Sequence, residues 1–282
     1  TWFLMLAFFV VVVGLAWAFS YALDTPAILY AAVAFALFMN VGSYWFSDKL
    51  ALSTSGAKPA EGPEYLELNR IVENLAIANG LPKPRVFVID DPAPNAFATG
   101  RDPKHAAVAV TTGLLSAMER PELEGVLAHE LSHVKNRDTL VMTVVIVLLG
   151  FVTLLSDFFI RSHFWGRGGS DRGGQARAVM VLVGFVLAIL APIVAQLIHL
   201  AISRKREFLA DASGALLTRY PEGLASALKK IGAYQAPMQR ANNATAHLFI
   251  SNPFGPGARK GFASLFMTHP PVEDRIKALI GK

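Results

Sequence analysis

The sequence contains no cysteine, and this absence excludes several kinds of structure. Without cysteine there is no disulfide framework to hold a small extracellular fold together. A metal ion can have no thiolate ligand, so any metal site must be built from His, Asp or Glu. Because the chain has only 7 histidines, the positions at which such a site can lie are few.

Charged residues are also scarce, at 17% of the 282-residue chain, whereas hydrophobic residues make up 53%. In soluble domains about a quarter of the residues are charged. The net charge is +5, but no basic patch is interleaved with aromatic residues, so we expect no nucleic-acid partner. Basic residues beside membrane helices on the cytoplasmic side account for the positive charge.

The apolar residues gather in four stretches, each long enough to cross about 30 Å of hydrocarbon as a helix. Runs of this length without Lys or Arg are typical of membrane-spanning helices rather than of buried core helices. We therefore predict four transmembrane helices, at residues 2–21, 27–46, 140–160 and 178–202. A cleaved signal peptide is the alternative for the first stretch, although its apolar core is long for that role.

Two polar regions, residues 47–138 and 203–282, flank the second pair of apolar stretches. We expect them to fold together as one catalytic domain, with the membrane pair 139–202 and its Gly-rich loop inserted between them and with residues 1–46 as the N-terminal pair. The basic residues near the spans favour a cytoplasmic domain by seven to four. The seven are Lys49, Lys58, Lys135, Arg137, Arg204, Lys205 and Arg206, and the four that oppose them are Arg161, Arg167, Arg172 and Arg177. If residues 140–202 form a shallow hairpin that does not fully cross the bilayer, the four opposing arginines no longer conflict with a cytoplasmic domain.

The first polar region has the pattern of an α+β fold with a small β-sheet. Residues 64–79 have helical periodicity. Residues 85–90, 95–99 and 106–112 read as short strands, and the Gly-Arg-Asp-Pro turn between the last two predicts a hairpin. Pro121 is expected to open the next helix.

That helix carries the motif His129-Glu130-x-x-His133. Positions four apart lie on one helical face, so both imidazoles can reach a single ion. Glu130 lies at the edge of this face, where its carboxylate can act as a general base towards water. Two neutral nitrogen ligands and a carboxylate base are what a zinc hydrolase needs. Because the apolar stretch from Leu140 follows closely, we expect the motif helix and the third span to form one continuous helix.

Glu207 and Asp211 are again four apart, directly after the fourth apolar stretch. Glu207 suits the third zinc-ligand position, which leaves the fourth position to water. Asp211 can accept a hydrogen bond from the other ring nitrogen of a ligating histidine and so orient it. The alternative for Glu207 is an ion pair with a nearby arginine on a solvated helical face.

Four motifs together resemble those of the HtpX-type membrane metallopeptidases, to which the CAAX prenyl-proteases are more distantly similar. They are the H-E-x-x-H motif, the E-x-x-A-D motif that begins at Glu207, the stretch Asn95-Ala96-Phe97-Ala98 and the tail Thr268-His269-Pro270-Pro271. The resemblance covers nearly the whole chain and implies a polytopic membrane protein with a zincin-like catalytic domain. A CAAX-type protease is the alternative within enzymes, but such chains usually have more than four spans.

The resemblance implies a zinc endopeptidase of the gluzincin type, with one zinc ion per subunit. His129, His133 and Glu207 would be the ligands and Glu130 the general base. The expected setting is the prokaryotic inner membrane, with the catalytic domain facing the cytoplasm. The expected substrates are misfolded or damaged membrane or cytoplasmic proteins, cleaved as part of quality control and the stress response.

A second hydrogen-bond donor is expected to stabilise the oxyanion of the transition state. His269 is the first candidate for this catalytic role, followed by Arg275 and Arg204. His269 could instead be a permanent fourth zinc ligand. That arrangement would support the alternative from another class, a membrane-bound holdase or binding protein with a structural metal.

Two further sites are predicted near the metal. Asn95–Ala98 resembles the edge strand on which such proteases bind an extended substrate, and backbone pairing of this kind does not read side chains. The alternative interpretation is that Asn95–Ala98 is an ordinary strand of a hairpin. Asn136 lies two turns after His129 and is expected to brace the site, or else to cap the helix at the membrane boundary.

Overall fold

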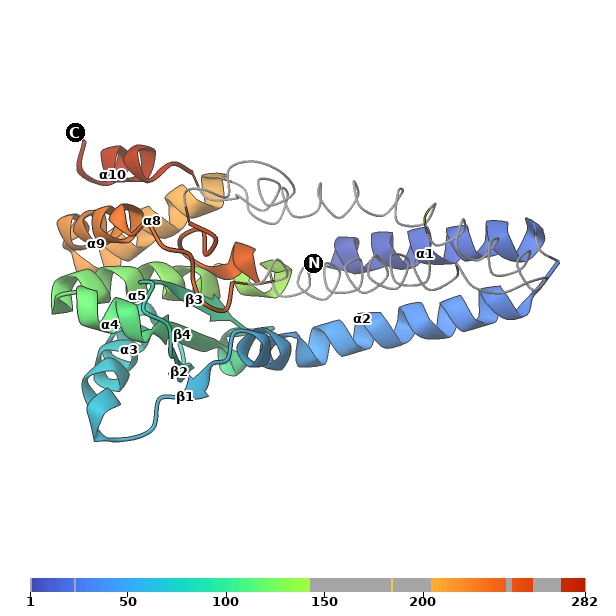
Figure 1. The fold of residues 1–282 in the computed structure, drawn as a ribbon, viewed down its shortest axis with the longest axis horizontal. Helices are drawn as coiled ribbons and strands as arrows, with labels where there is room; N and C mark the ends of the chain where they lie inside the picture. The colour runs from blue at the N-terminus through green and yellow to red at the C-terminus, as the bar shows by residue number, and fades with distance from the viewer. Residues whose placement is uncertain are drawn as a thin grey trace, which may run out of the picture.

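The computed structural model of the chain describes residues 2–22, 24–142, 184, 204–241, 245–255 and 270–281. Two long helices, α1 (Trp2–Ala22) and α2 (Ala27–Thr54), lie against each other and extend away from a globular part. The globular part holds a small sheet and the shorter helices (Figure 1). The described residues therefore form a helix-rich α+β structure with one mixed sheet, as expected.

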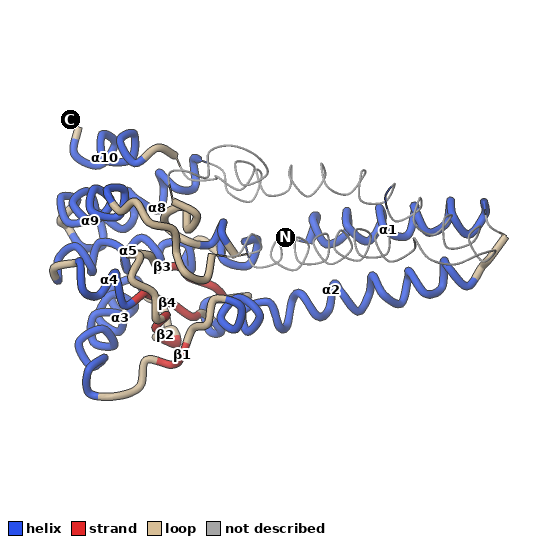
Figure 2. The backbone as a smooth tube through the Cα atoms, viewed as in Figure 1, coloured by secondary structure: helices blue, strands red, loops and turns tan. Residues whose placement is uncertain are grey.

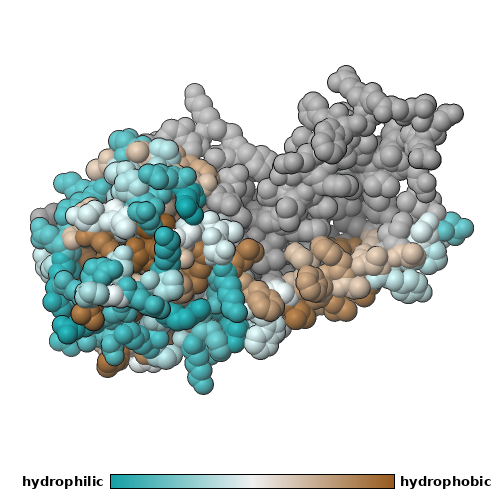
Figure 3. All heavy atoms as spheres, turned by 60° about the horizontal axis from the view of Figure 1, so that its bottom comes forward, coloured by the Kyte–Doolittle hydropathy of each residue, from teal (hydrophilic) through white to brown (hydrophobic). Residues whose placement is uncertain are grey.

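The extension presents an apolar surface along α2. Its exposed side chains include Phe38, Val41 and Phe46, and this surface contrasts with the mainly hydrophilic globular part (Figure 3). By length and apolar composition, no single helix of the described residues qualifies as a membrane span. The two halves of α2, Leu29–Gly42 and Tyr44–Thr54, qualify together, with a bend of 67° between them. The predicted spans 140–160 and 178–202 lie outside the described residues, except for residues 140–142 and 184.

Helix α2 continues to Thr54, past the predicted boundary at residue 46. Asp48 and Lys49 end the apolar run but not the helix, because Lys49 is exposed and the buried Asp48 is paired with Arg85. The last turns of α2 pack against the sheet, where Ala51 and Leu52 are buried. The end of α2 is thus part of the core of the globular part.

The sheet has four strands in the order β1-β2-β4-β3. The first strand pair and the last are antiparallel, whereas β2 and β4 are parallel. The predicted hairpin is confirmed, with Phe97 opposite Ala109. The strands are β1 (Lys58–Pro59), β2 (Arg85–Ile89), β3 (Ala96–Thr99) and β4 (Ala107–Thr111).

Alternate residues of β2, β3 and β4 enter two separate cores, as the two-residue period of a strand requires. Val108 and Val110 pack in the core that contains α3 and α5. Ala107 and Ala109 pack in the second core, where the rings of Phe97 and Phe249 meet edge to face at 5.1 Å. Both faces of the sheet are therefore covered.

The helices of the globular part gather around α5 (Arg120–Lys135), which packs against β3, α3, α8 and α9 (Figure 2). The predicted helix over 64–79 is confirmed as a 3-10 turn, η1 (Pro63–Tyr65), followed by α3 (Leu66–Asn79). Gly80, with φ +70°, ends α3 in the left-handed conformation. The remaining elements are η2 (Pro103–His105), α4 (Thr112–Ala117), α8 (Arg204–Thr218), α9 (Pro221–Ala233), η3 (Ala246–Leu248) and α10 (Val272–Ile280).

The start of α5 is fixed to α9. Pro121 lies in the first turn of α5, as predicted, and the Glu122 carboxylate accepts the backbone N–H of Glu119 at 2.8 Å. The same carboxylate accepts hydrogen bonds from Ser226 Oγ and Lys230 Nζ, both at 2.6 Å. One buried carboxylate thus caps α5 and holds it on α9.

The expectation of one continuous helix from the H-E-x-x-H motif into the third apolar stretch is wrong. Helix α5 ends at Lys135, Arg137 adopts the left-handed conformation with φ 58°, and helical backbone resumes at residues 138–142. A left-handed residue cannot continue a right-handed helix, so the helix is interrupted here. The turn brings Asp138 next to His133.

Helices α5 and α8 approach each other closely where the motif lies. A Cβ atom added to Gly214 of α8 would lie 2.9 Å from the backbone nitrogen of His129. No side chain fits in that space, because backbone atoms cannot move aside as the end of a side chain can. Gly214 therefore sets the spacing between the two helices that supply the predicted ligands.

We expect Gly214→Ala to destabilise the protein by about 1–3 kcal/mol, since the gain in helix propensity is outweighed by the backbone clash. Zinc content should fall with it. Thermal unfolding and metal analysis of the purified protein measure both quantities. The control is Gly232→Ala in α9, where the new Cβ would meet Val272 at an ordinary 3.5 Å. Equal effects of the two substitutions would contradict the assignment of Gly214 as the spacer.

Candidate metal centre

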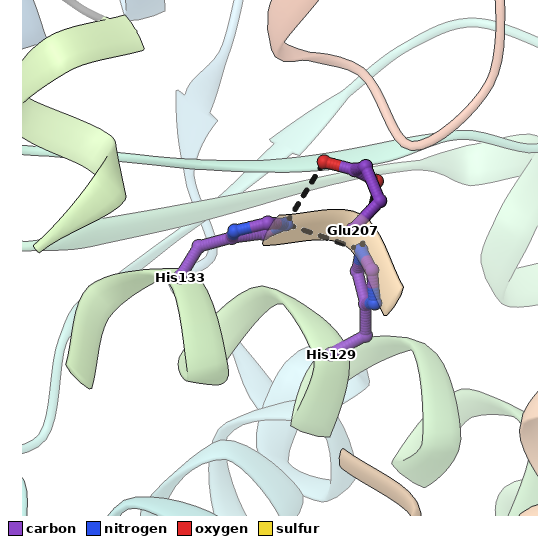
Figure 4. Close-up of side chains that lie close together, drawn as sticks. All are labelled: His129, His133 and Glu207. Carbon is purple, nitrogen blue, oxygen red and sulfur yellow. Dashed lines mark hydrogen bonds and ion pairs between the residues drawn. The ribbon is translucent and has the colours of Figure 1, made fainter. Parts of the chain in front are cut away.

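The structure brings together three side chains that can hold a metal ion. His129 and His133 project from α5 towards Glu207 of α8, as Figure 4 shows. One ligand atom from each residue lies within 4.8 Å of the others, and all three side chains are buried. Among the described residues, this is the group of His, Asp and Glu with metal-ligand geometry.

The spacing of the ligand atoms fits a tetrahedral zinc ion. The two Nε2 atoms are 3.2 Å apart. His133 Nε2 lies 3.5 Å from Glu207 Oε1, and His129 Nε2 lies 3.8 Å from the other carboxylate oxygen, Oε2. Ligands bound to zinc at about 2.0–2.1 Å in a tetrahedron lie roughly 3.3–3.4 Å from each other. Three ligands of this kind leave one coordination position for water or substrate, as in catalytic zinc sites.

Each histidine is oriented by a carboxylate on its other ring nitrogen. His129 Nδ1 lies 2.9 Å from Asp211 Oδ1, and His133 Nδ1 lies 3.2 Å from Asp138 Oδ2. These contacts favour a proton on each Nδ1, so that both Nε2 atoms offer their lone pair to the centre. The predicted contact of Asp211 with a ligating histidine is present, whereas that of Asp138 was not predicted.

Both orienting carboxylates are themselves held by arginines. Arg275 of α10 is buried and binds Asp211 through two parallel hydrogen bonds, from Nε at 2.9 Å and from Nη2 at 2.7 Å. Arg206 of α8 forms an ion pair with Asp138. Bidentate arginine–carboxylate pairs fix geometry as well as charge. Helix α10 is thereby tied to the metal-binding face of α5 and α8.

The electrostatics of the centre favour a cation. Burial opposes the charged form of His133, but the hydrogen bond to Asp138 and the charges of Glu207 and Glu130 raise its pKa to about 9. Burial likewise opposes ionisation of Asp211, but Arg275 and His129 lower the pKa of Asp211 to about 2. Four carboxylates (Glu130, Glu207, Asp138 and Asp211) face two guanidinium groups (Arg275 and Arg206), an excess of two negative charges that a divalent ion balances.

Two other residues that the sequence suggested for the site, Asn136 and Arg204, lie apart from the metal centre. Asn136 is exposed at the C-cap of α5, and Asp138, two residues further on, contacts His133 in its place. Arg204 is exposed at the first position of α8. Arg275 reaches the centre, with Nη2 3.4 Å from His129 Nδ1, but its guanidinium is bound to Asp211. His269 lies outside the described residues.

Strand β3 is the edge strand of the sheet and packs against α5. Its first half is already occupied by the chain itself: the Ala96 carbonyl accepts the Ile250 N–H at 2.9 Å, and Asn95 exchanges side-chain hydrogen bonds with the backbone of Ser251. Phe97 points into the second core. Because Asn95 pairs with Thr111, the antiparallel pattern turns the backbone groups of Ala98 away from β4.

We expect Asp138→Ala to weaken zinc binding about 10–100-fold, because His133 loses the group that orients its ring. Competition with a chelator of known zinc affinity measures the change. The matched control is Asn136→Ala at the exposed C-cap, which should leave the affinity unchanged. The reverse ranking would mean that Asn136, as the sequence suggested, braces the site.

Comparisons with known proteins agree with this geometry. Peptidase family M48 matches residues 64–282. A protease HtpX homolog from Caldanaerobacter subterraneus subsp. tengcongensis is 51% identical over 266 residues, which cover 93% of this chain and 86% of that relative. A protease HtpX homolog from Pyrococcus furiosus is 51% identical over 250 residues, covering 88% and 84% of the two chains.

Among solved structures, that of S. mikatae Ste24p aligns with a TM-score of 0.52 and 20% sequence identity, over 99% of this chain and 67% of that one. At this identity the likeness is one of fold. The family match, the sequence identity and the His-His-Glu centre together identify the enzyme. The chain belongs to peptidase family M48, as a zinc metallopeptidase of the HtpX type.

Proposed function

We propose that this zinc protease hydrolyses unfolded segments of membrane proteins and of proteins at the cytoplasmic membrane surface. The observation that carries the proposal is the buried His129–His133–Glu207 centre beside an edge strand. The centre supplies a catalyst for amide hydrolysis, and the strand supplies a place for an extended peptide. Neither requires a particular substrate sequence.

His129, His133 and Glu207 would hold the metal. Zinc supplies a Lewis acid that polarises the scissile carbonyl and makes water acidic enough to react near neutral pH. Glu130 is buried next to His129, and its charge contributes to the raised pKa of His133, so its carboxylate lies close to the ligands. We assign it as the general base that takes the proton of the attacking water. Glu130 then delivers this proton to the leaving amine as the C–N bond breaks.

The substrate backbone would pair with the outer edge of β3 at Ala98. The neighbouring edge positions are held by Ile250 and Ser251, so the proposed contact is limited to Ala98, which is itself buried in this structure. The role of Asn95 is then to hold the 250–251 segment rather than to contact substrate. His269 is the proposed donor to the oxyanion. Arg275, whose guanidinium is bound to Asp211, is instead proposed to position that carboxylate beside His129.

The four apolar stretches and the apolar surface of α2 (Figure 3) support placement in a membrane. We place the chain in a prokaryotic inner membrane as a four-span protein, with the catalytic part in the cytoplasm. The end of α2 packs on the sheet, so the metal centre would lie near the bilayer surface. Substrates in the membrane, or just leaving it, would reach it most readily, which suits a role in quality control and stress.

We expect Glu130→Gln to lower cleavage of an unfolded model membrane protein in detergent by at least about 10²–10⁴-fold, the usual contribution of a general base. Zinc content should stay that of the native chain, because the amide leaves all three ligands in place. Product formation on gels and metal analysis measure the two quantities. The matched control is Glu124→Gln on the same helix, whose carboxylate pairs with Arg120 at the surface.

The outcomes separate the two functional classes. Activity lost in Glu130→Gln but kept in Glu124→Gln, with zinc retained in both, supports a hydrolase with Glu130 as its base. Equal activity of the native chain and Glu130→Gln would remove Glu130 from the mechanism. Tightly held zinc without cleavage by the native chain would favour the holdase with a structural metal.

The cysteine-free sequence allows a clean test of orientation. We expect Thr25→Cys, in the turn between α1 and α2, to react with a membrane-impermeant maleimide in intact cells. Ala78→Cys, on the exposed face of α3, should react only after the cells are opened. The opposite labelling pattern would place the catalytic part outside the cytoplasm, against the positive-inside count.

A further inference from the structure

A pocket of about 460 Å³ lies where α2 meets the sheet. Its walls come from three places: the C-terminal half of α2, the start of β2 and the turn between β3 and β4. The side chains that matter are two aromatic residues, Trp45 and Phe46, and four basic residues, Lys49, Arg85, Arg101 and Lys104. The metal ligands and the residues that orient them do not line it.

The cations of the pocket are held against its aromatic walls. The Arg101 guanidinium lies 4.4 Å from the ring centroid of Trp45, and the Lys49 ammonium lies 5.6 Å from that of Phe46. Contacts of this kind are favourable and keep a cation close to an apolar surface. The Arg101–Trp45 contact also ties the β3–β4 turn to α2, so the pocket is built from two elements that are distant in sequence.

Part of the positive charge is left over after internal pairing. Arg85 pairs with Asp48 at 2.6 Å, and Asp102 contacts both Arg101 and His105. Within the part of the chain that the structure describes, no ion pair is formed by Lys49 or Lys104. The pocket therefore has an excess of two ammonium groups, which suits an anionic ligand.

The position of the pocket indicates the source of that anion. Trp45 and Phe46 are half-exposed at 50% and 59%, next to the apolar surface of α2. In the view of Figure 3, hydrophilic side chains of the globular part meet this apolar surface. Aromatic residues followed by lysines and arginines at the end of an apolar helix are typical of the level of lipid headgroups.

We propose that this pocket binds the phosphate headgroup of an anionic phospholipid. The proposal rests on the membrane placement given under the proposed function. Lys49 and Lys104 bind the phosphate, Arg101 and Arg85 line the pocket beside it, and the acyl chains follow the apolar face of α2. A bound headgroup would bridge α2 and the β3–β4 turn, and would thus hold the edge strand at a fixed height above the bilayer.

The test uses the full-length protein in detergent and short-chain lipids of defined headgroup. Binding of dioctanoyl phosphatidylglycerol and dioctanoyl phosphatidylcholine is measured by calorimetry, with inorganic phosphate as competitor. We expect the anionic lipid to bind more tightly. Lys49→Gln with Lys104→Gln should lower its affinity about 25-fold, at about fivefold for each lysine near a headgroup. Millimolar inorganic phosphate should not displace it, because phosphate lacks the apolar part.

The matched control is Lys229→Gln with Lys277→Gln, two exposed lysines on α9 and α10 that remove the same charge elsewhere. The control should bind the anionic lipid within about twofold of the native chain. An equal loss in both double variants would reduce the effect to general surface charge and overturn the proposal. So would an unchanged affinity in the Lys49/Lys104 variant, or full displacement by inorganic phosphate, which would point to a site for soluble anions.

Peptidase activity and zinc content are measured in the same samples against a soluble unfolded substrate. If every variant cleaves the substrate but the protein shows no preference for the anionic headgroup, only the proposed lipid site is wrong. If the protein prefers the anionic headgroup but shows no peptidase activity, the proposed function is wrong and the proposed lipid site is supported. Neither lysine belongs to the metal centre, so the detergent activity of the double variant should equal that of the native chain.

Discussion

The close approach of α5 and α8 is the constraint on which the catalytic part depends. Gly214 lets the two backbones come within a distance that no other residue allows. At this spacing Glu207 reaches His129 and His133, and Asp211 reaches the far side of the His129 ring. Buried charges are tolerated only when they are paired, so a wider spacing would leave isolated charges rather than a weaker site.

Around this crossing, the charges form one connected network drawn from four parts of the chain. The ligands come from α5 and α8, Asp138 from the turn after α5, and Arg275 from α10. The network orients both imidazoles and leaves an excess of negative charge that zinc neutralises. The same contacts hold the two polar regions together, although residues 139–202 separate them in sequence. Metal binding and the integrity of the catalytic part therefore have a common physical origin.

The sheet links this centre to the membrane side of the molecule. One face of the sheet packs on α5, while the other is covered by the last turns of α2 and by the segment around Phe249. Strand β3 thus lies between the metal-binding helix and the helix proposed to enter the bilayer. Among the described residues, α2 connects the apolar extension with the sheet, whereas α5 is interrupted at Arg137.

Local spacing in the sequence determined the elements and the metal ligands. A repeat of four residues places His129 with His133, and Glu207 with Asp211, on single helical faces, and the Gly-Arg-Asp-Pro turn between two short strand segments predicts the β3–β4 hairpin. Only the tertiary structure decided the rest. Asp138 contacts His133 just after the break in the helix at Arg137, Arg275 reaches Asp211 across 64 residues, and Ile250 covers half of the edge strand. Periodicity reports which face of an element a residue occupies, whereas contacts between distant elements depend on how those faces pack, which no local pattern encodes.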